Sequence, residues 1–145
     1  MPPASGYSGT PLSRKLGFKS GFRCYTNVPL EEYRARFDTL PDDLTFLIKP
    51  AAPLDFVHLF VVTYRDLVKR ITAIHNLLTP TGMIWISWLK KASGIPTDVD
   101  EGTIRELALS MGLVDVKVCS VDDVWSGLKL VIPVKLRPKS IASKQ

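Results

Sequence analysis

Two apolar segments, residues 56–62 (FVHLFVV) and 83–89 (MIWISWL), constrain the fold of this chain more than any other feature. Each is largely apolar at both odd and even positions, which is typical of a strand covered on both faces, as in a parallel sheet. Between them, apolar residues recur at helical spacing from Leu67 to Leu78, with charged residues in the gaps. The order strand, helix, strand predicts a βαβ unit.

The flanking segments contain further elements, each bounded by prolines, glycines or capping residues. Helices are expected at residues 11–16, 30–37 and about 98–111, and strands at residues 22–27, 44–48, 114–120 and 128–134. The last two strands predict an antiparallel hairpin, and Pro133 places it at a sheet edge. We therefore expect an α/β, three-layer Rossmann-like fold. Its mostly parallel sheet of about six strands ends in the hairpin and has helices on both faces.

A chain of 145 residues predicts one domain, and its hydrophobic share of 46% excludes the disordered class. We expect residues 1–10 to form a flexible segment, 11–135 a single domain and 136–145 a basic tail. Cys24 and Cys119 stand in separate apolar segments without metal-ligand spacing, so we expect buried thiols and no metal. No apolar run reaches the roughly 18 residues of a membrane helix, and no signal peptide is evident, so we expect a cytoplasmic protein without a membrane partner.

The formal net charge of +5 suggests a nucleic-acid partner, but the distribution of the charge argues against one. Residues 1–30 contain no acid and carry +4, and residues 135–145 carry another +4. The intervening residues carry −3. We therefore expect no nucleic-acid partner.

Three segments are similar to those of class I methyltransferases: LDFVHLFVV (54–62), LTPTGMIWISW (78–88) and GLVDVKVCSVDDVWSGLKLV (112–131). The first two resemble the fourth strand and the turn into the fifth, and the last resembles the closing hairpin. The resemblance covers about residues 15–135 and implies the same fold. The last segment, with GYSGTPLSRKLG (6–17) and WISWLKKASGIPTD (85–98), also resembles a bacterial family of small proteins of unknown function.

Both cofactor signatures of the methyltransferases are absent. Thr26-Asn27-Val28-Pro29 stands where those enzymes have a glycine-rich turn, and Lys49-Pro50 where they have an acid for the ribose. The length is also short of the roughly 180 to 200 residues of a seven-strand sheet, so we expect one strand-helix unit to be missing. These motifs do not support S-adenosylmethionine as the cofactor.

The departure from the family pattern favours a non-catalytic domain that binds a small anionic ligand or a protein partner at the carboxyl ends of its strands. The alternative is a reduced S-adenosylmethionine-dependent methyltransferase-type enzyme with an atypical cofactor site. A third hypothesis is a homo-oligomeric scaffold that uses the hairpin edge.

Ligands of open α/β sheets bind at the carboxyl ends of the strands, and three segments are expected there. The loop after the strand at 83–89 offers two lysines, a Ser-Gly pair and the start of a helix, which together suit an anion. Its candidate residues are Lys90, Lys91, Ser93, Gly94, Thr97 and Asp98, with Asn27 at the same edge. Solvated lysines and an Asp98–Glu101 capping box explain the loop equally well.

Trp125 and Ser126 form the second candidate, with Trp125 either as a pocket wall or as a seal on the core. Residues 6–10 form the third, either as a lid or as a disordered tail in which Thr10 caps the first helix.

No catalytic residue can be assigned from the sequence. The two SxxK matches, at Ser87 and Ser126, lie at strand ends rather than at the start of a helix, and about one is expected by chance. His58 is interpreted as a core residue and His75 as a surface residue, so a serine-histidine triad is not expected.

Overall fold

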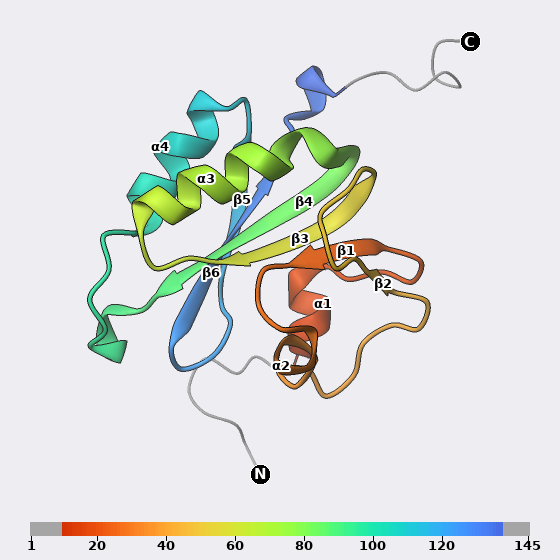
Figure 1. Cartoon of the computed structure of the whole chain (residues 1–145), viewed down its shortest axis with the longest axis horizontal. Helices are drawn as coiled ribbons and strands as arrows, with labels where there is room; N and C mark the ends of the chain where they lie inside the picture. The colour runs from red at the N-terminus through yellow and green to blue at the C-terminus, as the bar shows by residue number, and fades with distance from the viewer. Residues whose placement is uncertain (1–9, 138–145) are drawn as a thin grey trace.

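The computed structural model describes residues 10–137 and contains one six-stranded sheet in the order β2-β1-β3-β4-β6-β5 (Figure 1). The first four of these strands are parallel, and β6 runs antiparallel to both β4 and β5. The strands are β1 (Arg23–Thr26), β2 (Thr45–Phe46), β3 (Leu54–Phe60), β4 (Leu78–Leu89), β5 (Val114–Ser120) and β6 (Trp125–Val131). This confirms the expected Rossmann-like fold with its antiparallel hairpin.

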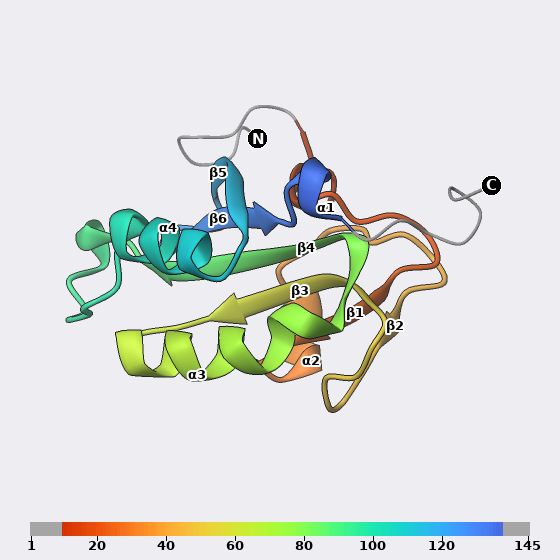
Figure 2. The ribbon, with the colours of Figure 1, turned by 90° about the horizontal axis from the view of Figure 1, so that it is seen from above.

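Helices cover both faces of the sheet: in Figure 1, α3 and α4 lie above it and α1 and α2 lie below, and Figure 2 looks onto the face that α3 and α4 cover. Leu67 and Ile71 of α3 share a core cluster with Ile104 of α4, whereas Leu16 of α1 and Tyr33 of α2 share the other. The helices are α1 (Leu12–Leu16), α2 (Leu30–Arg34), α3 (Tyr64–Ile74) and α4 (Glu101–Ser110), with 3-10 turns η1 (His75–Leu77), η2 (Lys91–Ser93) and η3 (Val134–Leu136).

Two helix starts differ from the expected ones. The α1 cap position is Pro11 rather than Thr10, and no side chain caps it. The capping box of α4 is made by Asp100 and Thr103, not by Asp98 and Glu101. The reason is that the Asp98 carboxylate already accepts the backbone N–H of Tyr64 at 2.7 Å, at the start of α3.

The hairpin also differs from the expectation in detail. Strand β6 lies inside the sheet, and β5 forms the edge. Pro133 does not disturb β6, because that strand ends at Val131 and the proline precedes η3. Of the two cysteines, Cys24 is buried as expected, but Cys119 is only half-buried because it lies on the edge strand.

The expected flexible segment at 1–10 and basic tail at 136–145 lie almost entirely outside the described residues. Within residues 10–137, no helix is long and apolar enough to cross a membrane.

Strand β4 begins five residues earlier than expected, so that residues 79–82 lie within the strand. The pairing of β3 with β4 shifts there, from Leu54 opposite Leu78 to Phe56 opposite Met83. Gly82 permits this irregularity because a Cβ at that position would lie 2.8 Å from the backbone oxygen of Leu54, closer than real Cβ atoms approach.

Gly82→Ala should therefore lower the free energy of unfolding by about 1–3 kcal/mol in urea denaturation, as overpacking of a core does. Gly102→Ala is the matched control, because its Cβ would stand 3.4 Å from the nearest atom, on the exposed side of α4. The control should gain up to ~1 kcal/mol from helix propensity. An unchanged stability of Gly82→Ala would contradict the proposed steric conflict.

Candidate functional site

The order in which the chain adds strands reverses between β1 and β3. From β1 the chain continues to β2 on one side, and from β3 it continues to β4 on the other side. Ligands of open α/β sheets bind at the carboxyl ends of the strands beside such a switch point. In this chain those ends are Thr26 of β1, Phe46 of β2 and Phe60 of β3.

Asn27 closes the crevice between β1 and β3. Its Oδ1 accepts the backbone N–H of Phe60 at 2.8 Å, and its Nδ2 donates to the backbone oxygen of the same residue at 2.9 Å. Asn27 therefore fastens the two strand ends together at the position where a glycine-rich turn would admit a ligand. The ligand-binding role of Asn27 remains a prediction. Both polar atoms of its side chain already bond the backbone of Phe60.

A cavity of about 230 Å³ lies between the carboxyl ends of β1 and β2. It is next to Asn27, whose two hydrogen bonds to the backbone of Phe60 we call the Asn27 clamp. Its walls are mostly apolar and include Val28, Leu30 and Ile48. Ile48 is 96% exposed and Leu30 is 39% exposed, which is unusual for large apolar side chains. Thr26 also lines the cavity, and its hydroxyl is a buried atom that has no hydrogen-bond partner among residues 10–137.

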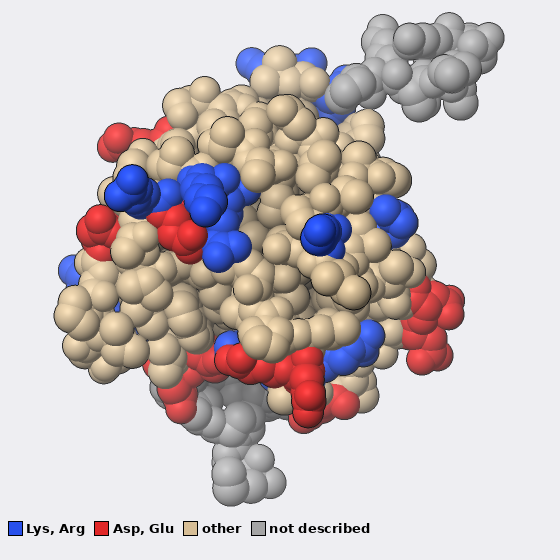
Figure 3. All heavy atoms as spheres, in the orientation of Figure 1, with Lys and Arg blue, Asp and Glu red and all other residues tan. Residues whose placement is uncertain are grey.

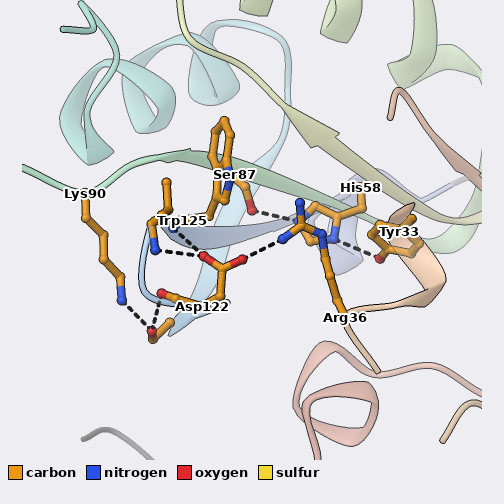
Figure 4. Close-up of polar contacts among 9 residues, drawn as sticks. Tyr33, Arg36, His58, Ser87, Lys90, Asp122 and Trp125 are labelled. Carbon is orange, nitrogen blue, oxygen red and sulfur yellow. Dashed lines mark hydrogen bonds and ion pairs between the residues drawn. The ribbon is translucent and has the colours of Figure 1, made fainter. Parts of the chain in front are cut away.

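Behind the carboxyl edge, three polar side chains form a fully buried chain (Figure 4). Ser87 Oγ lies 2.7 Å from His58 Nε2, and Tyr33 Oη lies 2.9 Å from His58 Nδ1. Burial, and to a lesser degree the positive charge of Arg36, lowers the pKa of His58 to about 3, so the imidazole is neutral. The arrangement resembles a nucleophile, a base and an orienting group, but all three residues are 0% exposed and no substrate reaches them.

His58 is thus a core histidine, as expected, but the sequence does not reveal its partners. One sequence signal could have predicted that His58 contacts Ser87: each of the two apolar strands contains a single polar residue, and these are the two residues. Their contact depends on the register, in which His58 pairs with Trp85 and Phe60 with Ser87.

An ion pair covers this buried chain at the carboxyl edge (Figure 4). Arg36 Nη1 lies 2.5 Å from Asp122 Oδ2, and the guanidinium lies 4.7 Å from the centre of the Phe60 ring. Trp125 packs edge-to-face on Phe60, with 5.2 Å between the ring centres, and its backbone N–H donates to Asp122 Oδ1 at 2.8 Å. These contacts explain Trp125 as a seal on the core; the pocket-wall role remains a prediction.

The predicted anion-binding loop borders a groove of about 460 Å³. Four of the predicted residues line it: Lys91, Gly94, Thr97 and Asp98. The others do not: the Lys90 ammonium donates to Ser120 Oγ at 2.7 Å, and Ser93 Oγ accepts the N–H of Ile95 at 3.2 Å. Ser126 lies within β6, between Trp88 and Ser120 of the neighbouring strands.

The charges in this groove are mixed. Lys91 shares it with the carboxylates of Asp98 and Asp100. Asp100 accepts the backbone N–H of Thr103 at 2.8 Å and so occupies the N-terminus of α4 with its own side chain. Anion binding by this loop therefore stays a prediction that its geometry does not strengthen. Among the described residues, no cluster of three or more His, Cys, Asp or Glu could hold a metal ion.

Solved structures with the same fold include methyltransferases. The magnesium protoporphyrin IX methyltransferase of Synechocystis with bound SAM matches 83% of this chain and 74% of its own, with a TM-score of 0.54 and 12% identity. The DhpI–SAH complex matches 82% and 80%, with a TM-score of 0.55 and 11% identity. A protein assigned as a methyltransferase, from a Haloferax volcanii complex with a methyltransferase activator, matches 84% and 86%, with a TM-score of 0.54 and 14% identity.

At these identities the matches establish a methyltransferase-like fold. The leaning against an enzyme is contradicted by them, because one of these structures is a methyltransferase with bound SAM, another is a complex with SAH, and the third contains a protein assigned as a methyltransferase. No family model and no curated protein matches the sequence, so membership of the small bacterial family remains a prediction.

The residues at the switch point fit one part of such a cofactor. The mostly apolar cavity at the ends of β1 and β2 suits an apolar ring such as adenine, and the buried hydroxyl of its lining residue Thr26 lacks a hydrogen-bond partner among the described residues. The glycine turn and the ribose-binding acid are replaced by the Asn27 clamp and by Lys49. A conventional mode of binding is therefore excluded for the rest of the cofactor.

The neutral state of His58 should make stability depend on pH. The unfolded chain takes up a proton at the ordinary histidine pKa of 6.5, whereas the folded chain does so only near 3. The stabilisation is complete above pH 6.5 and is lost as the pH falls towards 3, with a slope approaching about 1.4 kcal/mol per pH unit.

Urea denaturation at a series of pH values measures this slope. In His58→Gln the slope should decrease by that amount. Equal slopes for wild type and His58→Gln would contradict a neutral buried imidazole.

Proposed function

We propose that this chain is a reduced S-adenosylmethionine-dependent methyltransferase-type enzyme with an atypical cofactor site at the carboxyl ends of β1 and β2. When bound, the cofactor supplies an electrophilic methyl group. The solved structures with bound SAM or SAH support the class of ligand, and the sheet order supports the position of the site.

The observation that carries the proposal is a mostly apolar cavity that is lined by Thr26, a residue whose buried hydroxyl has no hydrogen-bond partner among residues 10–137. A buried hydroxyl without a partner costs about 1–3 kcal/mol. A ligand that brings both an apolar ring and a polar nitrogen into this cavity removes that cost and covers the exposed side chains of Leu30 and Ile48. An adenine ring has both properties.

The cavity holds only part of the cofactor. Its volume of about 230 Å³ is below the roughly 300 Å³ at which small-molecule sites begin, so the remainder must lie across the open edge. Without an acid for the ribose hydroxyls, we expect weaker binding than in a conventional site.

Calorimetry of the full chain with S-adenosylmethionine and S-adenosylhomocysteine tests this function. We expect a measurable heat with a micromolar to millimolar Kd. The absence of heat at millimolar cofactor would exclude both the cofactor and the enzyme class proposed on it.

Thr26→Val tests the site itself. The change preserves the shape of the side chain and removes the unpartnered hydroxyl, so the free protein should be at least as stable as wild type. The Kd should rise about fivefold, the equivalent of one hydrogen bond. Thr72→Val, on the exposed side of α3, should leave the Kd unchanged. Equal affinities for all three proteins would place the cofactor elsewhere.

A further inference from the structure

Six cations that are dispersed in the sequence come together around α1, β5 and β6. We call Arg14, Lys15, Lys19, Lys90, Lys117 and Lys129 the basic cluster. Two hydrogen bonds hold its parts together: Lys117 Nζ donates to the backbone oxygen of Lys15 at 3.1 Å, and Lys90 Nζ donates to Ser120 Oγ at 2.7 Å. The Lys129 side chain extends to Gly17, the residue that follows α1. If Gly17 carried a Cβ atom, that atom would lie 3.9 Å from Lys129 Nζ.

No acid neutralises the basic cluster within residues 10–137. The ion pairs of this part of the chain belong to Arg36, Arg70 and Arg105. The N-terminal segment that supplies three of the six cations contains no acid before Glu31. By contrast, acidic and basic side chains occur together on the face shown in Figure 3.

The like charges in the basic cluster repel one another. Burial lowers the pKa of Lys129, and the neighbouring Lys117 and Lys19 lower it further. Close like charges without a partner destabilise a folded protein, whereas an anionic ligand turns the same arrangement into a favourable one.

The cluster also borders a cavity of about 520 Å³ between α1 and the edge strand β5. Arg14, Lys15 and Lys117 line it, together with the hydroxyl-bearing Thr10 and Ser120. Its volume is within the range of small-molecule sites. Arginine and lysine side chains that converge with hydroxyl groups form charge-assisted hydrogen bonds to phosphate oxygens.

We propose that this cavity binds a small ligand that carries phosphate groups. The number of converging cations favours a ligand with more than one negative charge, such as a diphosphate. A single-stranded nucleic acid is less suited, because none of the described residues that line the cavity is aromatic and could stack on a base. The site is separate from the proposed cofactor site, since β3, β4 and β6 stand between β1 and β5 in the sheet.

Thermal unfolding of the full chain with inorganic pyrophosphate tests the proposal, with sodium chloride of equal ionic strength as the reference. At about ten times its Kd, pyrophosphate should raise the Tm by about 5 °C. Calorimetry with pyrophosphate then gives the Kd. The absence of both a Tm shift and a heat at millimolar pyrophosphate would overturn the proposal.

Charge-removing variants locate the binding. In Lys117→Gln and in Arg14→Gln, the Kd for pyrophosphate should rise about tenfold. Both residues are exposed and the changes relieve repulsion, so the Tm without ligand should not fall; if one variant fails to fold, the other still provides the test. Lys69→Gln, an equal charge change on exposed α3, should bind as wild type does.

Two results would contradict a built phosphate site even if pyrophosphate binds. An equal loss of affinity in Lys69→Gln would mean that only the net charge matters. Tighter binding of a single-stranded oligonucleotide than of pyrophosphate, weakened by the same two variants, would assign the cluster to nucleic acid. The cofactor titration uses a different ligand and different variants. A negative result with pyrophosphate therefore does not affect the test of S-adenosylmethionine binding.

Discussion

The structure depends on the parallel pairing of β3 with β4, the two strands that are buried on both faces. Val57 and Ile84 face α3 and α4, whereas Phe56 and Trp85 face α1 and α2, so both core clusters are built on the same pair of strands. Trp85 extends this role, because its indole N–H donates to the backbone oxygen of Leu16 at 2.8 Å and so fixes α1 on the sheet. The α1 position in turn determines where the basic cluster forms.

Periodicity was sufficient to predict which segments are strands or helices, but not where each one ends. The segments 56–62 and 83–89 were identified because burial on both faces requires apolar residues at every position. The start of α4 was not, since the choice between Asp98 and Asp100 as its cap depends on a hydrogen bond from Tyr64, 34 residues away in the sequence. Strand β4 likewise extends through a Pro-x-Gly segment because Gly82 has room only for a hydrogen.

The candidate sites show a similar division. The loop at 90–98 does lie at the carboxyl edge of β4, as the strand order predicts, but its lysines point to different surroundings. The charge arithmetic was misleading for a related reason, because it adds charges along the chain. Arg14 and Lys15 seemed to belong to an end segment, whereas the fold brings them beside Lys117, about a hundred residues later. Clusters of charged side chains from distant parts of the sequence depend on the topology of the fold, and the amino-acid composition does not reveal them.

The buried hydrogen bond between Tyr33 and His58 links the stability of α2 to that of the central strands. Helix α2 has five residues, and a helix of that length is not stable in isolation. Its anchor is a tyrosine whose hydroxyl finds its partner, His58, on β3, and that histidine is in turn held by Ser87 on β4. The stability of α2 therefore depends on the pairing of the two central strands, so a change that separates β3 from β4 should also release the helix from the sheet.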